Sequence, residues 1–105
     1  MSDFLDQPVA GPISLNSSQA SPRRATDIDR LIGARLRRLR KQLKVRQAAV
    51  AERIGVSFPQ IQKYESGANR VSVSALIRIC NVLGLQPYAV LAAICDDIER
   101  EEARN

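Results

Sequence analysis

The stretch that decides the fold of this chain is QAAVAERIGVSFPQIQKY, residues 47–64. Its apolar positions recur at spacings of three and four residues, which is the period of one face of an α-helix. Gly55 interrupts the pattern at a point where a left-handed turn is cheap only for glycine. We therefore expect two short helices that pack against each other across a tight turn. The side chains expected to lie between them are Val50, Ala51, Ile54, Val56, Ile61 and Tyr64.

The start of the second helix is marked by Ser57. Its hydroxyl can accept a hydrogen bond from a backbone N–H group of the first turn, and Ser57 with Gln60 forms a capping box. Pro59 disfavours a helical conformation at Phe58, so the helix begins at Phe58 or one residue later, at Pro59.

The exposed face expected for this second helix carries Gln60, Gln62 and Lys63. Amide and ammonium groups are suited to base edges and phosphates. Two amphipathic helices in any small helical domain would show the same apolar period. Here the apolar positions, the turn glycine and the helix cap agree in one register, which favours a helix-turn-helix.

The composition is that of one small domain, with 105 residues, 45% of them hydrophobic, and no tryptophan. Cys80 and Cys95 lie in apolar helical stretches without a CxxC pair or any histidine, so we expect reduced, packed thiols and no metal site. No apolar run approaches the roughly 18 residues of a membrane span, and Asp3 and Asp6 stand where a signal peptide would be basic. We expect a cytoplasmic, nucleoid-associated protein that does not contact membranes.

Positive charge is concentrated in the middle of the chain. The segment from Arg30 to Arg70 contains eleven basic residues and two acidic ones, whereas the segment from Cys95 to Asn105 contains two basic and five acidic ones. A basic block beside an acidic tail favours a nucleic-acid-binding surface whose tail faces away from phosphate. Solvated charge on a helix surface would explain any one of these residues taken alone.

The chain divides into three parts. Residues 1–25 contain three of the five prolines and no sustained period, which predicts a disordered N-terminal arm. Arg23 and Arg24 in that arm are either solvated or reach into a DNA groove. Residues 26–95 carry the helical pattern of the DNA-binding domain. Residues 96–105 are expected to be the charged, frayed end of the last helix and a tail.

Within the helical domain, Thr26 is a candidate N-cap for the first helix, and the residues that open the last two helices are Ser72 and Pro87. The corner between the first two helices lacks the residue types that usually end one helix and begin the next. A glycine is expected where Lys44 stands and a Ser, Thr or Asn cap where Arg46 stands. A left-handed Lys44 costs about 1 kcal/mol. Our hypothesis is that the two added charges near the expected phosphate path offset that cost.

The segment from Ile32 to Leu91 resembles the Cro and phage-repressor family of helix-turn-helix proteins, also called XRE-type regulators. The resemblance implies an all-α, five-helix, lambda-repressor-like DNA-binding domain. The run from Phe58 to Arg70 resembles a subgroup common in alphaproteobacteria. The marks of the family are Gln47 at the start of helix two, the triple Ala51, Gly55 and Ile61, and Glu65-Ser66-Gly67 followed by a basic loop.

The resemblance also implies how the chain holds double-stranded DNA. Lys63 is suited to guanine and Phe58 to a thymine methyl group, although Phe58 could instead pack partly against helix two, and Gln62 could face bases or phosphate. At the positions of Phe58 and Pro59, many relatives have side chains that form hydrogen bonds with bases. This chain lacks them, so we expect its specificity to depend more on DNA shape. The residues expected at the major groove are Phe58, Pro59, Gln62 and Lys63, and those expected at the phosphate backbone are Arg46, Gln47, Ser57, Gln60, Asn69 and Arg70.

Two further predictions concern assembly. The resemblance suggests a structural ion pair between Arg40 and Glu65. Leu91, Ile94 and Ile98 form a stripe on the last helix, and a stripe without an intrachain partner predicts an isologous dimer contact. The alternative is that Val90, Leu91 and Ile94 complete the monomer core.

The expected function is therefore a sequence-specific transcriptional regulator, a repressor that binds a two-fold symmetric operator as a homodimer. The alternative is an antitoxin or antirepressor module that binds another regulatory protein, with DNA binding secondary. An enzyme is disfavoured, because the chain has no histidine, no clustered pair of carboxylates in its central block and no phosphate-binding glycine loop. No cofactor, metal or catalytic residue is predicted.

Overall fold

The computed structural model describes residues 25–104, and every element in that range is a helix. The predicted all-α class and the five helices of the domain are confirmed. The predicted N-terminal arm, with Arg23 and Arg24, lies outside the described residues. The helices are α3 (Ala25–Gln42), α4 (Gln47–Ile54), α5 (Phe58–Ser66), α6 (Val73–Leu83) and α7 (Pro87–Arg104).

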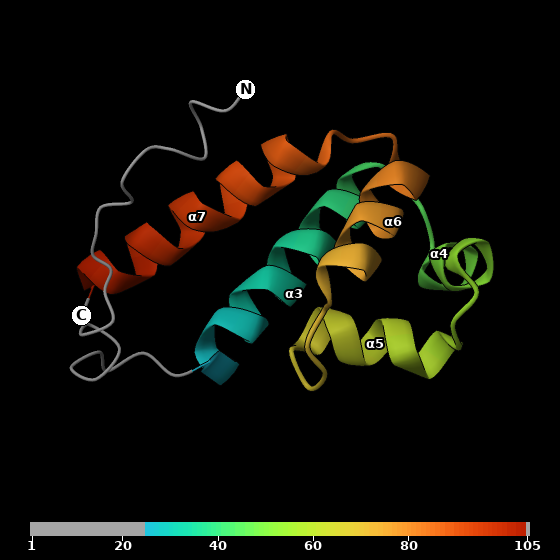
Figure 1. Ribbon diagram of the computed structural model, residues 1–105, viewed down its shortest axis with the longest axis horizontal. Coiled ribbons are helices and arrows are strands. Elements are labelled where there is room, and N and C mark those ends of the chain that lie inside the picture. The colour runs from blue at the N-terminus through green and yellow to red at the C-terminus, as the bar shows by residue number, and fades with distance from the viewer. Residues whose placement is uncertain (1–24, 105) are drawn as a thin grey trace, which may run out of the picture.

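The helices close around one core (Figure 1). The helix α3 packs against α5 and α7, α4 packs against α5 and α6, and α6 packs against α7. Each helix therefore has at least two neighbours and turns one apolar face inward. The core residues are Leu36, Val50, Ala51, Ile54, Ile61, Ile79, Cys80, Leu83, Val90 and Ile94.

The helices α3 and α5 cross so closely at Gly33 that a side chain at this position would not fit. A Cβ atom placed on Gly33 would lie 2.2 Å from the carbonyl oxygen of Tyr64 and 2.6 Å from that of Glu65. Gly33 is itself buried in the middle of α3. The missing side chain therefore lets the backbones of the two helices meet, and this fixes the depth at which α5 sits on its scaffold.

Local sequence signals set the ends of α4 and α5 as predicted. Gly55 ends α4 in the left-handed conformation, with φ +77°. The Ser57 hydroxyl accepts a hydrogen bond from the backbone N–H of Gln60 at 3.2 Å, and α5 begins at Phe58 with Pro59 in its first turn. The turn between the helices is thus built from residues that adopt its conformation at little cost.

The corner between α3 and α4 has the unusual form that the sequence predicts. Lys44 is left-handed, with φ +60°, and it is the one such residue other than glycine in the described part of the chain. Arg46 occupies the N-cap of α4 and makes no capping hydrogen bond with its side chain.

Three expectations need correction. The helix α3 begins at Ala25, so Thr26 lies inside its first turn and is not the N-cap. The helix α7 continues to Arg104, where a frayed end was expected, because Asp97 packs onto α3 and extends the buried face. Cys95 is exposed, whereas Cys80 is buried as expected, and burial raises the pKa of the Cys80 thiol.

Within residues 25–104, no single helix is both long and apolar enough to cross a membrane. The pair α6 and α7 meets such a test only jointly, and it is bent by 112°. The described residues contain no cluster of histidine, cysteine or carboxylate side chains suited to a metal ion.

Candidate nucleic-acid interface

The helix α5 presents one exposed face. Phe58 is 45% exposed, and the residues that follow it by one, four and five positions, Pro59, Gln62 and Lys63, are also exposed. Ile61, on the opposite face, is only 1% exposed. All four residues predicted to face the major groove therefore share an accessible face.

A buried network holds α5 in place. The ion pair predicted between Arg40 and Glu65 is present: Arg40 Nε donates to Glu65 Oε2 at 2.7 Å, and Arg40 Nη2 donates to Glu65 Oε1 at 2.9 Å. Each residue is 9% exposed. Gln47 Nε2 donates to the same Oε1 atom at 2.8 Å. One carboxylate on α5 therefore binds both α3 and the first residue of α4, which fixes the relative orientation of the three helices.

The third nitrogen of Arg40 reaches the unusual corner. Arg40 Nη1 donates to the carbonyl oxygen of Val45 at 2.8 Å, and the backbone N–H of Val45 donates to the carbonyl of Arg40 at 3.1 Å. The same guanidinium thus clamps α5 and the segment that contains Lys44 and Arg46.

The loop after α5 is also tied down. Asn69 Nδ2 donates to Gln60 Oε1 at 3.2 Å, and the backbone N–H of Asn69 donates to the carbonyl of Lys63 at 3.1 Å. Arg70 Nε lies 3.0 Å from Asp29 Oδ2 on α3, while its side chain stays 68% exposed. Three predicted phosphate ligands, Gln60, Asn69 and Arg70, are therefore held in fixed positions beside α5.

The hydroxyl group of Ser57 can still donate a hydrogen bond. Its hydroxyl oxygen accepts the capping bond from Gln60, but a hydroxyl group also carries a proton that it can donate. Ser57 is exposed, so that proton is accessible to an acceptor such as a phosphate oxygen.

The basic block divides into two classes of residue. Four of its members form ion pairs with described carboxylates: Arg30 with Asp27, Arg35 with Asp97, Arg40 with Glu65 and Arg70 with Asp29. The other members make no ion pair with any residue that the structure describes. These are Arg37, Arg38, Lys41, Lys44, Arg46, Arg53 and Lys63.

The pair Arg35–Asp97 was not expected from the sequence. Arg35 Nη2 donates to Asp97 Oδ1 at 2.6 Å and Arg35 Nε donates to Asp97 Oδ2 at 2.8 Å. The hydrogen bonds from Arg35 lower the pKa of the Asp97 carboxyl and raise the pKa of the Arg35 guanidinium. One signal was available: Arg35 follows Ile28 by seven residues and precedes Leu39 by four, so it shares their inward face.

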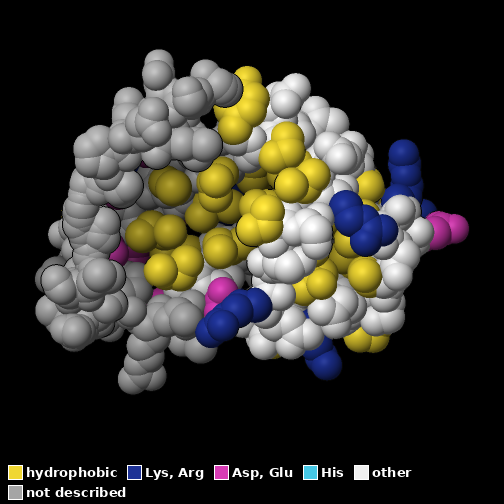
Figure 2. All heavy atoms as spheres, in the orientation of Figure 1, with side chains coloured by type: hydrophobic (Ala, Val, Ile, Leu, Met, Phe, Trp, Pro, Cys, Tyr) yellow, Lys and Arg dark blue, Asp and Glu magenta, His cyan; other side chains and the backbone are white. Residues whose placement is uncertain are grey.

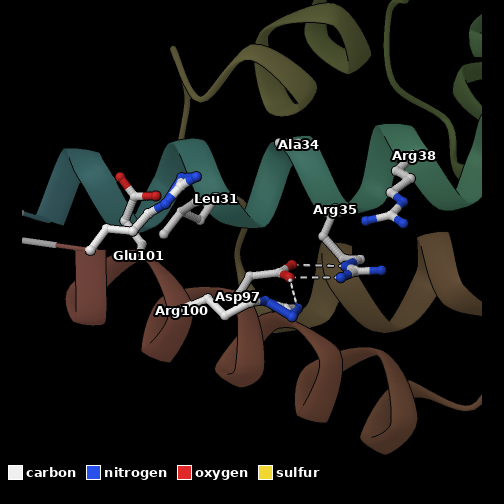
Figure 3. Close-up of a pocket in the computed structure, with 8 residues that line it drawn as sticks. Leu31, Ala34, Arg35, Arg38, Asp97, Arg100 and Glu101 are labelled. Atoms are coloured by element: carbon white, nitrogen blue, oxygen red, sulfur yellow. Dashed lines mark hydrogen bonds and ion pairs between the residues drawn. The ribbon is translucent and has the colours of Figure 1, made fainter.

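This pair lies in a groove of about 490 Å³ between α3 and α7. Figure 3 shows Asp97 pointing between Arg35 and Arg100, with dashed lines to both. Asp97 therefore pairs with cations from both helices, Arg35 on α3 and Arg100 on α7. The Arg35–Asp97 bonds join α7 to α3, and the lining of the groove includes none of the residues named above for the major groove or the phosphate backbone. Its lining comprises Leu31, Ala34, Arg35, Arg38, Asp97, Arg100, Glu101 and Arg104.

The predicted dimer stripe needs correction. Ile94 is 2% exposed and belongs to the monomer core, and Ile98 is partly buried against that core. The helix α7 turns these two side chains inward, so the premise that they have no intrachain partner is wrong. Leu91 remains 50% exposed.

A different stripe on α7 is accessible. Tyr88 is 74% exposed, and it is followed at spacings of three and four by Leu91 and Cys95, which are also exposed. On the adjacent helix α6, Val73 and Ile77 are exposed as well. Figure 2 shows hydrophobic side chains gathered near the centre of one face, in the region where Figure 1 places α6 and α7. Sequence reasoning missed Tyr88, because the sequence does not show which face of α7 packs against its neighbours.

Comparison with known proteins agrees with this geometry. A family model described as a helix-turn-helix domain matches residues 31–96. The uncharacterised HTH-type transcriptional regulator y4aM of Sinorhizobium fredii is 38% identical over 76 residues, which cover 72% of this chain and 53% of that protein. A second regulator from the same organism, y4wC, is 36% identical over 90 residues, which cover 86% of this chain and 62% of the relative. The chain thus spans between half and two thirds of the length of these two relatives.

Two further matches extend the comparison. An uncharacterised transcriptional regulator in the ATPase CF(0) region of Rhodospirillum rubrum is 41% identical over 78 residues, which cover 74% of this chain and 68% of the relative. Among solved structures, the clp gene regulator ClgR from Corynebacterium glutamicum matches with a TM-score of 0.69 and 27% sequence identity. That match covers 73% of this chain and 82% of ClgR. Sinorhizobium and Rhodospirillum are alphaproteobacteria, the group that the run from Phe58 to Arg70 predicts.

Proposed function

Since the chain belongs to the XRE-type helix-turn-helix family of DNA-binding transcriptional regulators, we propose that it is a sequence-specific repressor that binds a two-fold symmetric operator as a homodimer. The observation that carries the proposal is the exposed face of α5, which is fixed by the buried pair Arg40–Glu65. The DNA-binding unit is assigned to residues 26–95, and the protein acts on the nucleoid in the cytoplasm.

The exposed face of α5 reads bases. Lys63 donates to guanine O6 or N7, and Gln62 pairs with a base edge or a phosphate. Phe58 contacts a thymine methyl group, for which its 45% exposure leaves room. A preorganised helix loses little conformational entropy on binding, so its contacts translate into affinity.

A second set of residues holds the backbone and sets the register. Arg46, Ser57 and the ordered loop residues Asn69 and Arg70 donate to phosphate oxygens. Gln47 and Gln60 each make one internal hydrogen bond, with Glu65 and Asn69, and these bonds aim their remaining polar atoms. Backbone contacts of this kind supply affinity that depends on salt but not on sequence.

Dimerisation uses the exposed stripe of α7. A single α5 helix with few hydrogen-bonding side chains offers limited specificity, whereas two copies combine their contacts. The proposed interface includes Leu91, which the sequence also predicted. It includes Tyr88 in place of Ile94, because Ile94 is buried in the monomer. Two recognition helices related by a two-fold axis enter successive major grooves about 34 Å apart, which places half-sites roughly 10 base pairs apart.

Selection of bound duplexes from random DNA at about 0.15 M salt tests the proposal, because sequence-independent binding is weak at that ionic strength. We expect enrichment of one palindromic sequence with half-sites one helical turn apart. Recovery of unrelated sequences, with no motif above background, would contradict specific readout.

Sedimentation of the protein without DNA tests the dimer. The wild type should be a dimer at tens of micromolar, and Leu91→Asp should dissociate it. Phe58→Asp is the matched control, because Phe58 has a similar exposure but lies on α5. A monomeric wild type, or equal dissociation by both variants, would rule out this interface. A monomer would favour the alternative in which the exposed apolar residues bind another regulatory protein.

A further inference from the structure

Arg78 is a cation of α6 that binds the turn between α4 and α5. Its Nη2 atom donates to the carbonyl oxygen of Ile54 at 2.6 Å. Ile54 is the last residue of α4, and it is only 3% exposed. The last carbonyl groups of a helix have no N–H partner within that helix, so a buried carbonyl here needs a donor from elsewhere. Arg78 is that donor, from a different helix.

The other polar groups of the turn bond locally. The backbone N–H groups of Gly55 and Val56 both donate to the carbonyl of Ala51, at 2.9 Å and 3.0 Å. The side chain of Ser57 accepts its bond from within α5. In the described part of the chain, Arg78 therefore makes the one side-chain hydrogen bond that joins this turn to another element. Its positive charge also stabilises the C-terminal end of α4, where the helix dipole is negative.

The two ends of α5 are held by different helices. At the last turn, Glu65 accepts hydrogen bonds from Arg40 of α3 and from Gln47. The first turn of α5 follows directly on the segment that Arg78 binds. In Figure 1 the last turn of α5 lies beside α3, and its first turn lies at the far end, below α4. Loss of one anchor should therefore move one end of α5 more than the other.

The side chains that face DNA are divided between these two ends. Phe58 and Pro59 open α5, whereas Lys63 lies in its last turn. The proposed readout pairs Phe58 with a thymine methyl group and Lys63 with a guanine. Apolar contact requires heavy atoms within about 4.5 Å of each other, so a small movement of the first turn removes the methyl contact. The flexible side chain of Lys63 can still reach its base.

We infer that Arg78 is a positioning residue that sets base specificity at the start of α5 without contacting DNA. Its hydrogen bond to Ile54 fixes the turn, and the turn fixes the distance between Phe58 and the thymine. The inference rests on the proposed function. It extends that function to α6, a helix to which the proposed readout assigns no contact with DNA.

Operators with single altered bases test this role. In one series, each thymine of one half-site is replaced by deoxyuridine, which lacks the methyl group. In the other, each guanine is replaced by adenine in an exchanged base pair, which presents a donor where guanine has the O6 acceptor. The wild type should lose affinity about fourfold at one thymine, the factor for burying one methyl group. It should also bind more weakly when one particular guanine is changed.

Arg78→Met keeps an unbranched side chain but removes the donor and the charge. This variant should bind the thymine and deoxyuridine operators alike, and it should keep the preference for guanine. Arg53→Met is the matched control, because Arg53 is an exposed cation of α4 without an ion pair to a described acid. It removes the same charge and should keep both preferences. Thermal melting establishes that each variant is folded at the assay temperature. Arg78→Lys, which retains a donor, replaces Arg78→Met if the latter does not fold, and it should show a smaller loss of the same kind.

The outcomes separate this role from the proposed function. A thymine preference that survives in Arg78→Met, or equal loss of the thymine and guanine preferences, would overturn the role of Arg78 alone. So would the same selective loss in Arg53→Met. A salt slope lowered by about 0.9 with the thymine preference intact would also overturn it, because Arg78 would then be a phosphate ligand. A wild type that does not distinguish thymine from deoxyuridine would overturn the inference and the assignment of Phe58. A wild type with no preference at guanine either would overturn the proposed readout by α5 as well.

Discussion

The two corners that flank α4 meet the same steric requirement with different residues. At the second corner Gly55 takes φ +77° and Ser57 caps the next helix, whereas at the first corner Lys44 takes φ +60° and Arg46 leaves the helix uncapped by its side chain. The second corner is stabilised locally. The first is held by a distant residue, Arg40, whose guanidinium binds the carbonyl of Val45. A corner that departs from local preference therefore depends on its tertiary contacts.

Arg40→Ala should have the largest effect, because it removes the residue that supports the first corner and strands the buried carboxylate of Glu65. Loss of one partner of a buried ion pair costs about 3–5 kcal/mol of unfolding free energy. Urea denaturation measures the loss. Arg53→Ala, an exposed control on α4, should stay within about 0.5 kcal/mol of the wild type. An Arg40→Ala protein as stable as the wild type would show that the first corner supports itself.

Gly33→Ala should have the next largest effect. A Cβ atom there would overlap the carbonyl oxygens of Tyr64 and Glu65, so α5 must move away from α3. Overpacking of this kind costs about 1–3 kcal/mol. Ala34→Ser, at an exposed neighbouring position, is the control for thermal melting. DNA affinity should fall as well, since Gly33 fixes the depth at which α5 sits on α3. A fully stable Gly33→Ala protein would contradict the close crossing.

Gly55→Ala sharpens the comparison of the two corners directly. A Cβ atom at Gly55 would meet nothing within 4 Å, so the cost is that of the left-handed backbone alone, about 1–2 kcal/mol. Lys44→Gly should change stability by a similar or smaller amount in the opposite direction. Thermal melting of both variants measures the two signs. The same sign at both positions would mean that backbone strain does not distinguish the corners.

The smallest effect concerns the pair Arg35–Asp97, which docks α7 far from both corners. The hydrogen bonds from Arg35 hold the pKa of the Asp97 carboxyl below its ordinary value. The pair therefore stabilises the fold above that ordinary range, and its contribution is lost as the pH falls through the lowered folded pKa. As the pH falls below about 4, the wild type should lose stability more steeply than Asp97→Asn. Parallel acid-denaturation curves for the two proteins would show that the pair does not contribute this stability. Glu99→Gln, at an exposed position of α7, is the control.

Sequence reasoning succeeded where signals are local. The cap at Ser57, the glycine at the α4–α5 turn and the left-handed Lys44 each follow from one or two residue types, and the structure has all three. The pair Arg40–Glu65 came from the family resemblance, because no local rule links residues 25 positions apart.

The missed features all depend on how distant helices lie on one another. Asp97 meets Arg35 across 62 positions, Gly33 is explained only by the backbone of α5, and Ile94 is buried because α7 turns it toward α3 and α6. An apolar stripe gives the period of a helix but not the side on which its neighbour packs. The rotation of α7 about its axis therefore could not be predicted, and with it the surface available for dimerisation.

We propose that α5 reads sequence while the residues at its flanks bind the backbone, and equilibrium affinities on two duplexes test this most directly. Equilibrium affinities are measured at a fixed, stated salt concentration for the selected operator and for a scrambled duplex, with wild type, Lys63→Ala and Arg46→Ala. Lys63→Ala should lose roughly 1–3 kcal/mol on the operator and little on the scrambled duplex, whereas Arg46→Ala should weaken both alike. Equal losses on the two duplexes for Lys63→Ala would contradict base reading by α5.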